Sequence, residues 1–120
     1  MKFIILAKEP VISIFVIFLF ASCAKADTET IRLYAFAEAA YSQGRFFDVI
    51  EILHKENNFP PSLILRTKAE YFFGDLEAAE KTCRRAIKLR PSSIEANLYL
   101  ARILRDTGDI TGVQAAVESL

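Results

Sequence analysis

Residues 67–91 read TKAEYFFGDLEAAEKTCRRAIKLRP, and this stretch carries the clearest structural signal in the chain. Two segments with helical apolar spacing meet at Gly74-Asp75, and Pro91 closes the second of them. Glycine readily ends a helix, and an aspartate after it accepts hydrogen bonds from the free backbone amides that open the next one. We therefore expect one helix to end at Phe73 and a second to run from about residue 76 to residue 89.

The same turn recurs along the chain. Gly108-Asp109 lies 34 residues after Gly74-Asp75, and Gly44-Arg45 lies 30 residues before Gly74. Each glycine separates two apolar-periodic segments, and a period near this length is typical of repeated helical pairs. The pattern predicts six helices, at about residues 28–42, 46–56, 60–73 and 76–89, a fifth that ends before Gly108, and a sixth at 110–120.

Local signals place the helix starts and one buried face. Pro60-Pro61 suits the first turn of the third helix, because a proline there loses no hydrogen bond. Ser92 and Glu95, three residues later, form a capping box that begins the fifth helix. The apolar residues of the first helix follow the three-and-four spacing of a buried stripe, and they are Ile31, Leu33, Phe36, Ala37 and Ala40.

These segments resemble the tetratricopeptide repeat (TPR), a helix-turn-helix unit of about 34 residues. The best match is residues 67–79 followed by 86–91, which supply an aromatic pair, the glycine turn, two alanines and the closing proline. The resemblance covers residues 28–120 and implies an all-α fold, an αα-hairpin solenoid of about three repeats. The departures from the family pattern are Thr67, Glu70, Cys83 and Val113.

The resemblance also implies a concave groove lined by the first helix of each pair. Carried onto this chain, that surface consists of Ile31, Tyr34, Glu38, Tyr41, Ile64, Lys68, Tyr71, Phe72, Leu98, Arg102 and Arg105. Aromatic side chains beside cations are frequent in protein interfaces. We therefore expect a protein-interaction scaffold or adaptor that binds a peptide or helix with apolar anchors and an acidic group.

Composition and single residues argue against catalysis and nucleic-acid binding. The 120 residues carry 15 Lys and Arg and 15 Asp and Glu, so the chain lacks the basic excess of a nucleic-acid binder. His54 is the only histidine, which leaves no zinc cluster of the usual spacing, and we expect it exposed at the end of the second helix. Cys83 has Arg84 and Arg85 beside it, yet its repeat position favours burial over reactivity. We expect no enzymatic activity, no cofactor and no metal.

The fourth predicted helix is strongly basic. It carries Lys81, Arg84, Arg85, Lys88 and Arg90. Helical spacing spreads these cations over an outer face, where Glu77 and Glu80, one turn earlier, form surface ion pairs. Two interpretations are open, a solvated face or contact with anionic lipid head groups.

An export signal is expected at the N-terminus. Lys2 and Lys8 precede the uncharged run VISIFVIFLFASCA at residues 11–24, which has the length of a signal-peptide apolar region and is short for a membrane span. Phe20-Ala21-Ser22-Cys23 resembles a bacterial lipoprotein box, which implies that Cys23 is lipidated and becomes the first residue of the mature chain. Ala24-Lys25-Ala26 is a rival signal, whose cleavage releases a soluble domain. An uncleaved anchor is the third alternative.

These alternatives differ in where the protein resides. Lipidation makes residues 1–23 a lipoprotein signal and anchors a TPR-like domain, residues 28–120, to a membrane of the bacterial cell envelope, facing the periplasm. Cleavage after Ala26 gives a soluble periplasmic or secreted protein instead.

The last predicted helix suggests a second function. TPR proteins usually carry a capping helix after the last repeat, whereas this sequence stops at Leu120. Val113, Val117 and Leu120 are then expected to leave an apolar end exposed, unless that end is small and polar enough to stand alone. The alternative function is a structural subunit of an envelope complex that self-associates, as a homodimer for example, through this helix.

Overall fold

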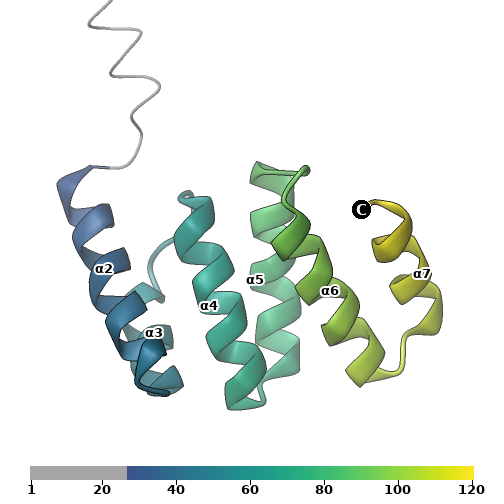
Figure 1. Cartoon of the computed structure of the whole chain (residues 1–120), viewed down its shortest axis with the longest axis horizontal. Coiled ribbons are helices and arrows are strands. Elements are labelled where there is room, and N and C mark those ends of the chain that lie inside the picture. The colour runs from purple at the N-terminus through teal and green to yellow at the C-terminus, as the bar shows by residue number, and fades with distance from the viewer. Residues whose placement is uncertain (1–26) are drawn as a thin grey trace, which may run out of the picture.

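The computed structural model describes residues 27–120, and within them the chain is helical (Figure 1). The helices are α2 (Thr28–Ser42), α3 (Phe46–Leu53), α4 (Pro60–Phe73), α5 (Leu76–Leu89), α6 (Ile94–Thr107) and α7 (Ile110–Glu118). This part of the chain contains no strand, and the all-α prediction is confirmed. The expected export signal, with Cys23 and the cleavage site at Ala26, lies outside the described residues.

Helices that are neighbours in the sequence are also neighbours in space. Each helix contacts the next one along the chain, and α4 also contacts both α2 and α6. Figure 1 shows α2, α4 and α6 side by side in one row, with α5 behind them. The helices at positions one, three and five of the described chain therefore share one face.

The core has two parts that meet at α4. Leu65 and Ala69 belong to a cluster with α2 and α3, whereas Leu63 and Ile64 belong to a cluster with α5, α6 and α7. Burial on several sides explains why α4 carries apolar residues around much of its circumference rather than in one stripe. Among the described helices, α4 is the only one that contributes buried residues to both parts of the core.

Side-chain caps begin four of the helices. Asp27, Asp75, Ser93 and Asp109 each accept a hydrogen bond from a backbone amide in the first turn of α2, α5, α6 and α7. Gly74 and Gly108 end α4 and α6 in the left-handed conformation, with φ of 100° and 87°, which glycine adopts without strain. The aspartate and glycine signals thus act as the sequence predicts.

The predicted capping box is wrong. Ser93, not Ser92, is the N-cap of α6, and its hydroxyl accepts a hydrogen bond from the Ala96 amide at 3.2 Å. Glu95 does not return to the cap, because its carboxylate forms an ion pair with Lys68 of α4.

The predicted end of the second helix is also wrong by about a turn. Helix α3 ends at Leu53, because the next residues form a loop held from two sides. One carboxylate oxygen of Glu56 accepts the backbone amides of residues 57–59 at 2.8–3.1 Å. The Arg66 guanidinium donates to backbone carbonyls at the end of α3, which substitutes for further helical hydrogen bonds. At the other end of the chain, α7 stops at Glu118.

The predicted buried stripe of the first helix is correct only in part. Ala37 and Ala40 are fully buried and Leu33 is half-buried, but Ile31 and Phe36 are 55% and 61% exposed. Among the described helices, only α3 and α4 contact α2, so the remaining sides of this helix face solvent.

Candidate interaction groove

A groove of about 320 Å³ lies between α2, α4 and the start of α6. Its lining consists of Tyr34, Glu38, Tyr41, Pro61, Ile64, Leu65, Lys68, Arg90 and Glu95. Residues three and four apart share a face of a helix, which is why positions 34, 38 and 41 of α2 meet positions 61, 64 and 68 of α4 here. Five of the residues predicted for the concave surface, Tyr34, Glu38, Tyr41, Ile64 and Lys68, come together in this groove.

Several polar side chains of the groove form pairs with one another. Lys68 forms an ion pair with Glu95, and the Tyr34 hydroxyl donates to Glu38 at 3.3 Å. Burial raises the pKa of the Tyr34 phenol above 10.0, with a further contribution from the Glu38 charge. Burial likewise raises the pKa of Tyr41. Both phenols therefore keep their protons at neutral pH.

A second set of predicted residues gathers around Tyr99 of α6. The Tyr71 ring meets the Tyr99 ring edge-on, with 5.9 Å between centroids, and its hydroxyl donates to Asp106 at 2.5 Å. That hydrogen bond, followed by burial, raises the pKa of the Tyr71 phenol. The Arg102 guanidinium lies over the Tyr99 ring, 5.2 Å from its centroid, and Arg105 pairs with Asp106 at 3.1 Å. We call Tyr71, Tyr99, Arg102 and Asp106 the Tyr99 cluster.

Lys68 joins the groove to this cluster. Its amine lies in the groove beside Glu95 and also 5.8 Å from the centroid of the Tyr99 ring. Cations over an aromatic face are attracted to its negative quadrupole, which fixes both partners. The two sets of residues therefore form a continuous surface over α2, α4 and α6.

Three residues predicted for the concave surface lie neither in the groove nor in the set around Tyr99. Phe72 turns toward α3, where its ring stacks on Phe46 with 5.5 Å between centroids. Ile31 and Leu98 are exposed on α2 and α6 but are not part of the lining. Their positions depend on the rotation of each helix about its axis, which the repeat spacing specifies only to within a residue or two.

Sequence reasoning missed four groups of this surface, Arg90, Glu95, Tyr99 and Asp106. Glu95 was assigned to a cap and Arg90 to the outer basic face, whereas both line the groove. Tyr99 is buried to 9% exposure, and it acts as the shared wall for two cations and Tyr71. An aromatic residue four positions from Glu95 on the same helix was the available signal for this site.

Two of the residues that depart from the TPR pattern, Thr67 and Glu70, are buried polar side chains. Glu70 is only 1% exposed, and its carboxylate accepts from Arg66 at 2.6 Å and from the Thr82 hydroxyl at 3.0 Å. Burial raises the pKa of Glu70 above 4.5, although Arg66 and Thr82 favour the charged form. Thr67 is buried as well, and its hydroxyl donates to the carbonyl of Leu63 at 2.8 Å.

The single cysteine and the single histidine of the described region each lie within hydrogen-bond distance of a backbone carbonyl. Cys83 is buried, its thiol donates to the carbonyl of Ala96 at 3.0 Å, and burial raises its pKa to about 12. A thiol with this pKa is almost entirely protonated at neutral pH and is a poor nucleophile. His54 is exposed at the end of α3, with Nδ1 2.7 Å from the carbonyl of Glu51, as expected from its position in the sequence.

The cations of the basic helix α5 differ in their surroundings, whereas the sequence predicted one outer face for all of them. Arg84 pairs with Glu80 at 2.9 Å on the surface, as expected for residues one turn apart. Arg85 instead reaches the loop before α4, where it donates to the Asn57 carbonyl and the Asn58 side chain, both at 2.9 Å. Only part of this face is therefore a simple solvated surface.

No family model matches the chain, and no curated protein matches it. Within residues 27–120, no group of three or more histidine, cysteine or acidic side chains is placed to hold a metal ion. None of the helices in this described region has the length and apolar character needed to cross a membrane.

Proposed function

We propose that this chain is a protein-interaction module, a TPR-like solenoid of three helical pairs whose groove binds a peptide or helix of a partner. The observation that carries the proposal is the continuous surface that α2, α4 and α6 build from aromatic, aliphatic and charged side chains. Such a surface acts by equilibrium binding, and the protein on this proposal is a scaffold or adaptor rather than an enzyme.

The charges of the surface indicate what the partner presents. Within the groove, Glu38 and Glu95 balance Lys68 and Arg90, so this part favours apolar anchors against Tyr41 and Ile64. Arg102 has no ion pair among the described residues, and its position over Tyr99 leaves it available to a carboxylate. The partner is therefore expected to place an apolar side chain in the groove and an acidic group beside Arg102.

A photo-crosslinking experiment tests this assignment. p-Benzoylphenylalanine replaces Tyr34 in the groove or, as a control, Lys88 on α5, and the full chain is irradiated in cells of the native host. Glu38→Lys reverses a groove charge, and Glu51→Lys makes the same change on an exposed position of α3. We expect a discrete adduct from position 34 alone, lost with Glu38→Lys and retained with Glu51→Lys. An adduct unaffected by Glu38→Lys contradicts groove binding.

We further propose that the module is tethered to a bacterial membrane through a lipid on Cys23 and faces the periplasm. The support is the sequence of residues 11–24 alone. Intact mass of the mature protein separates the alternatives, because lipidation adds mass at Cys23, cleavage after Ala26 removes that residue, and an uncleaved anchor retains the whole leader. A mature chain that starts at Asp27 overturns the tether and leaves a soluble periplasmic or secreted module.

Self-association through the last helix is a second candidate function, and exposed apolar side chains favour it. Among the described helices α7 contacts only α6, and Ile110, Val117 and Leu120 are each more than half exposed. Sedimentation of the full chain tests it, because Val117→Glu dissociates a dimer built on this face, whereas Val117→Ala largely preserves one. A monomer at all concentrations removes this candidate.

A further inference from the structure

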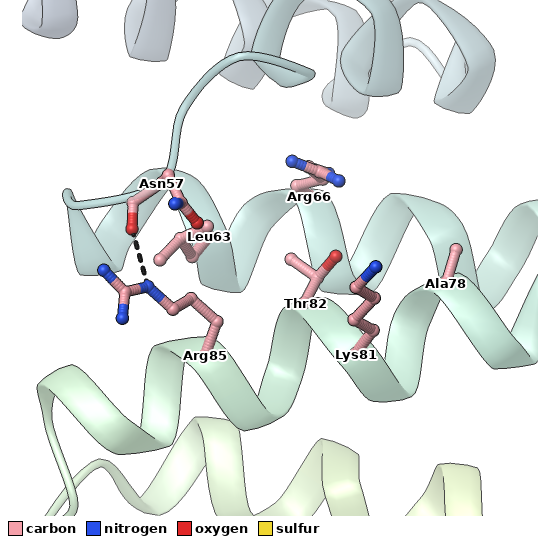
Figure 2. Close-up of a pocket in the computed structure, with 7 residues that line it drawn as sticks. All are labelled: Asn57, Leu63, Arg66, Ala78, Lys81, Thr82 and Arg85. Carbon is pink, nitrogen blue, oxygen red and sulfur yellow. Dashed lines mark hydrogen bonds between the residues drawn. The ribbon is translucent and has the colours of Figure 1, made fainter.

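A second cleft lies on the opposite side of α4 from the groove. It has a volume of about 500 Å³, and it is lined by Asn57, Leu63, Arg66, Ala78, Lys81, Thr82 and Arg85 (Figure 2). None of these residues lines the groove. Among the described helices α3 and α5 make no contact, and the cleft occupies the space between α5 and the loop that follows α3, with α4 at its base.

Two arginines of this cleft are held in fixed positions. Nε and one terminal nitrogen of Arg85 donate to Asn57 and Asn58 of the loop, each at 2.9 Å. Nε of Arg66 donates to Glu70, and Nη1 donates to the carbonyls at the end of α3. Each guanidinium keeps its other terminal nitrogen without a partner among the described residues. Side chains already immobilised in this way lose little entropy when they bind a ligand.

The residues that line the cleft include three cations and no acid. Arg66, Lys81 and Arg85 are its charged members, and only Arg66 has a carboxylate partner, the buried Glu70. Lys81 has no ion pair or hydrogen bond among the described residues. In Figure 2, the Lys81 and Thr82 side chains point from α5 toward the side of the cleft where Arg66 lies. Neighbouring cations repel one another, and an anion between them removes that repulsion.

We propose that this cleft binds an acidic segment of a partner protein. A carboxylate of that segment lies among Lys81, Arg85 and Arg66, and an aliphatic neighbour packs on Ala78, which is half-buried. The recessed position of Arg66, whose side chain is 24% exposed, favours an inserted side chain over the flat surface of a membrane. The site is independent of the proposed groove function, because it uses a different face and different residues.

The experiment uses a fluorescein-labelled peptide of leucine and glutamate, with the full chain kept in mild non-ionic detergent. Fluorescence anisotropy compares Lys81→Glu with Lys88→Glu, which makes the same charge change on an exposed position of α5 outside the cleft. We expect Lys81→Glu to weaken binding about tenfold or more and Lys88→Glu to change it less than about twofold. The same peptide with glutamine in place of glutamate is expected not to bind.

Equal weakening by the two variants overturns the proposal, because it indicates attraction to net charge rather than to the cleft. Inorganic phosphate and phosphatidylglycerol, the latter mixed into the micelles, serve as competitors. Displacement of the peptide by phosphatidylglycerol with the same dependence on Lys81 assigns the cleft to lipid head groups and also overturns the proposal. Displacement of the peptide by millimolar phosphate also overturns the proposal, because it assigns the cleft to a small anion.

Two further measurements exclude misfolding and binding elsewhere. Circular dichroism is expected to be unchanged in Lys81→Glu, because this exposed side chain makes no hydrogen bond or ion pair with the described residues. The Nε–H signals of Arg66 and Arg85 in nuclear magnetic resonance spectra are expected to shift when the peptide is added. The groove variant Glu38→Lys is expected to bind the peptide normally, so failure of the groove proposal and failure of the cleft proposal are distinguishable.

Discussion

Glu70 and Arg66 show how one buried charge sets the local structure of three helices. The Glu70 side chain on α4 is 2% exposed, Arg66 neutralises it, and the same guanidinium caps α3 while Thr82 on α5 supplies a further donor. Removing one partner of a buried pair leaves an uncompensated charge, which costs more than the pair contributes. This pair is therefore the point at which a single substitution has its largest electrostatic effect.

Arg66→Ala is expected to lower the free energy of unfolding by about 3 kcal/mol, because the Glu70 carboxylate then lies buried without its cation. Arg84→Ala is the matched control, since it breaks the exposed Glu80 pair and is expected to cost about 0.5 kcal/mol or less. Urea unfolding followed by circular dichroism measures both. Adding Glu70→Gln to Arg66→Ala should restore part of the loss, and costs that are equal for Arg66→Ala and Arg84→Ala contradict the buried pair.

The pH dependence of stability follows from the same carboxyl group. Burial raises the pKa of Glu70 in the folded protein above 4.5, so the folded state binds more protons than the unfolded state between 4.5 and the folded pKa. Stability therefore falls as pH rises through that window, and the contribution of the protonated group is fully present only below 4.5. Glu70→Gln, which stays neutral, should lack this decline.

The measurement is urea unfolding of wild type, Glu70→Gln and the exposed control Glu51→Gln at several pH values between 4 and about 7.5. The difference in unfolding free energy between wild type and Glu70→Gln is expected to move in favour of the variant as pH rises. The opposite trend means that Arg66 outweighs burial and lowers the pKa of Glu70.

The ends of the helices show which parts of the fold the sequence predicts. Asp75 and Gly74 act within one turn of themselves, and such local signals place α4 and α5 correctly. The end of α3 was missed because Arg66, 13 residues after Leu53, sets it from another helix. A single sequence shows no such long-range hydrogen bond, since the pairing depends on how the helices dock.

The groove also contains residues that could be predicted from the sequence and residues that could not. The resemblance to the TPR family predicted which residues of α2 and α4 line a common surface, and Tyr34, Glu38 and Lys68 do meet. Glu95 and Tyr99 were missed because their role depends on the contact between α4 and α6, where Lys68 reaches both of them. Helix periodicity therefore predicts faces, whereas the partners across a face require the tertiary structure.

The N-cap of α6 can be tested by substitution, because the structure places it at Ser93 and the sequence predicted Ser92. Ser93 accepts the Ala96 amide, whereas the predicted capping box uses Ser92 and Glu95. Ser93→Ala is expected to lower the free energy of unfolding by about 1 kcal/mol, as the loss of an N-cap hydroxyl typically does. Ser92→Ala is expected to have little effect, and thermal unfolding of the two variants compares them. A larger loss of unfolding free energy in Ser92→Ala than in Ser93→Ala supports the predicted capping box instead.

In the whole molecule, the dependence of each helix on its neighbours determines how stability is distributed. Helix α4 belongs to both core clusters, whereas α7 contacts only α6 among the described helices and buries only Ala116. Regions with few buried contacts open locally at a lower free energy than the global unfolding of the molecule. The described helices are therefore expected to differ in protection, with α4 the most stable and α7 the least.

Hydrogen exchange measured by mass spectrometry tests this distribution, with amides of α7 expected to exchange at least about a hundredfold faster than those of α4. Leu63→Ala identifies the mechanism, because deleting this buried side chain lowers global stability by about 3 kcal/mol. Amides of α4 exchange only through global unfolding and should become faster in the variant. Those of α7 open locally and should keep their rates, since α4 and α7 make no contact. If Leu63→Ala accelerates exchange in both helices equally, α7 unfolds only with the rest of the molecule, and an independently opening end helix is excluded.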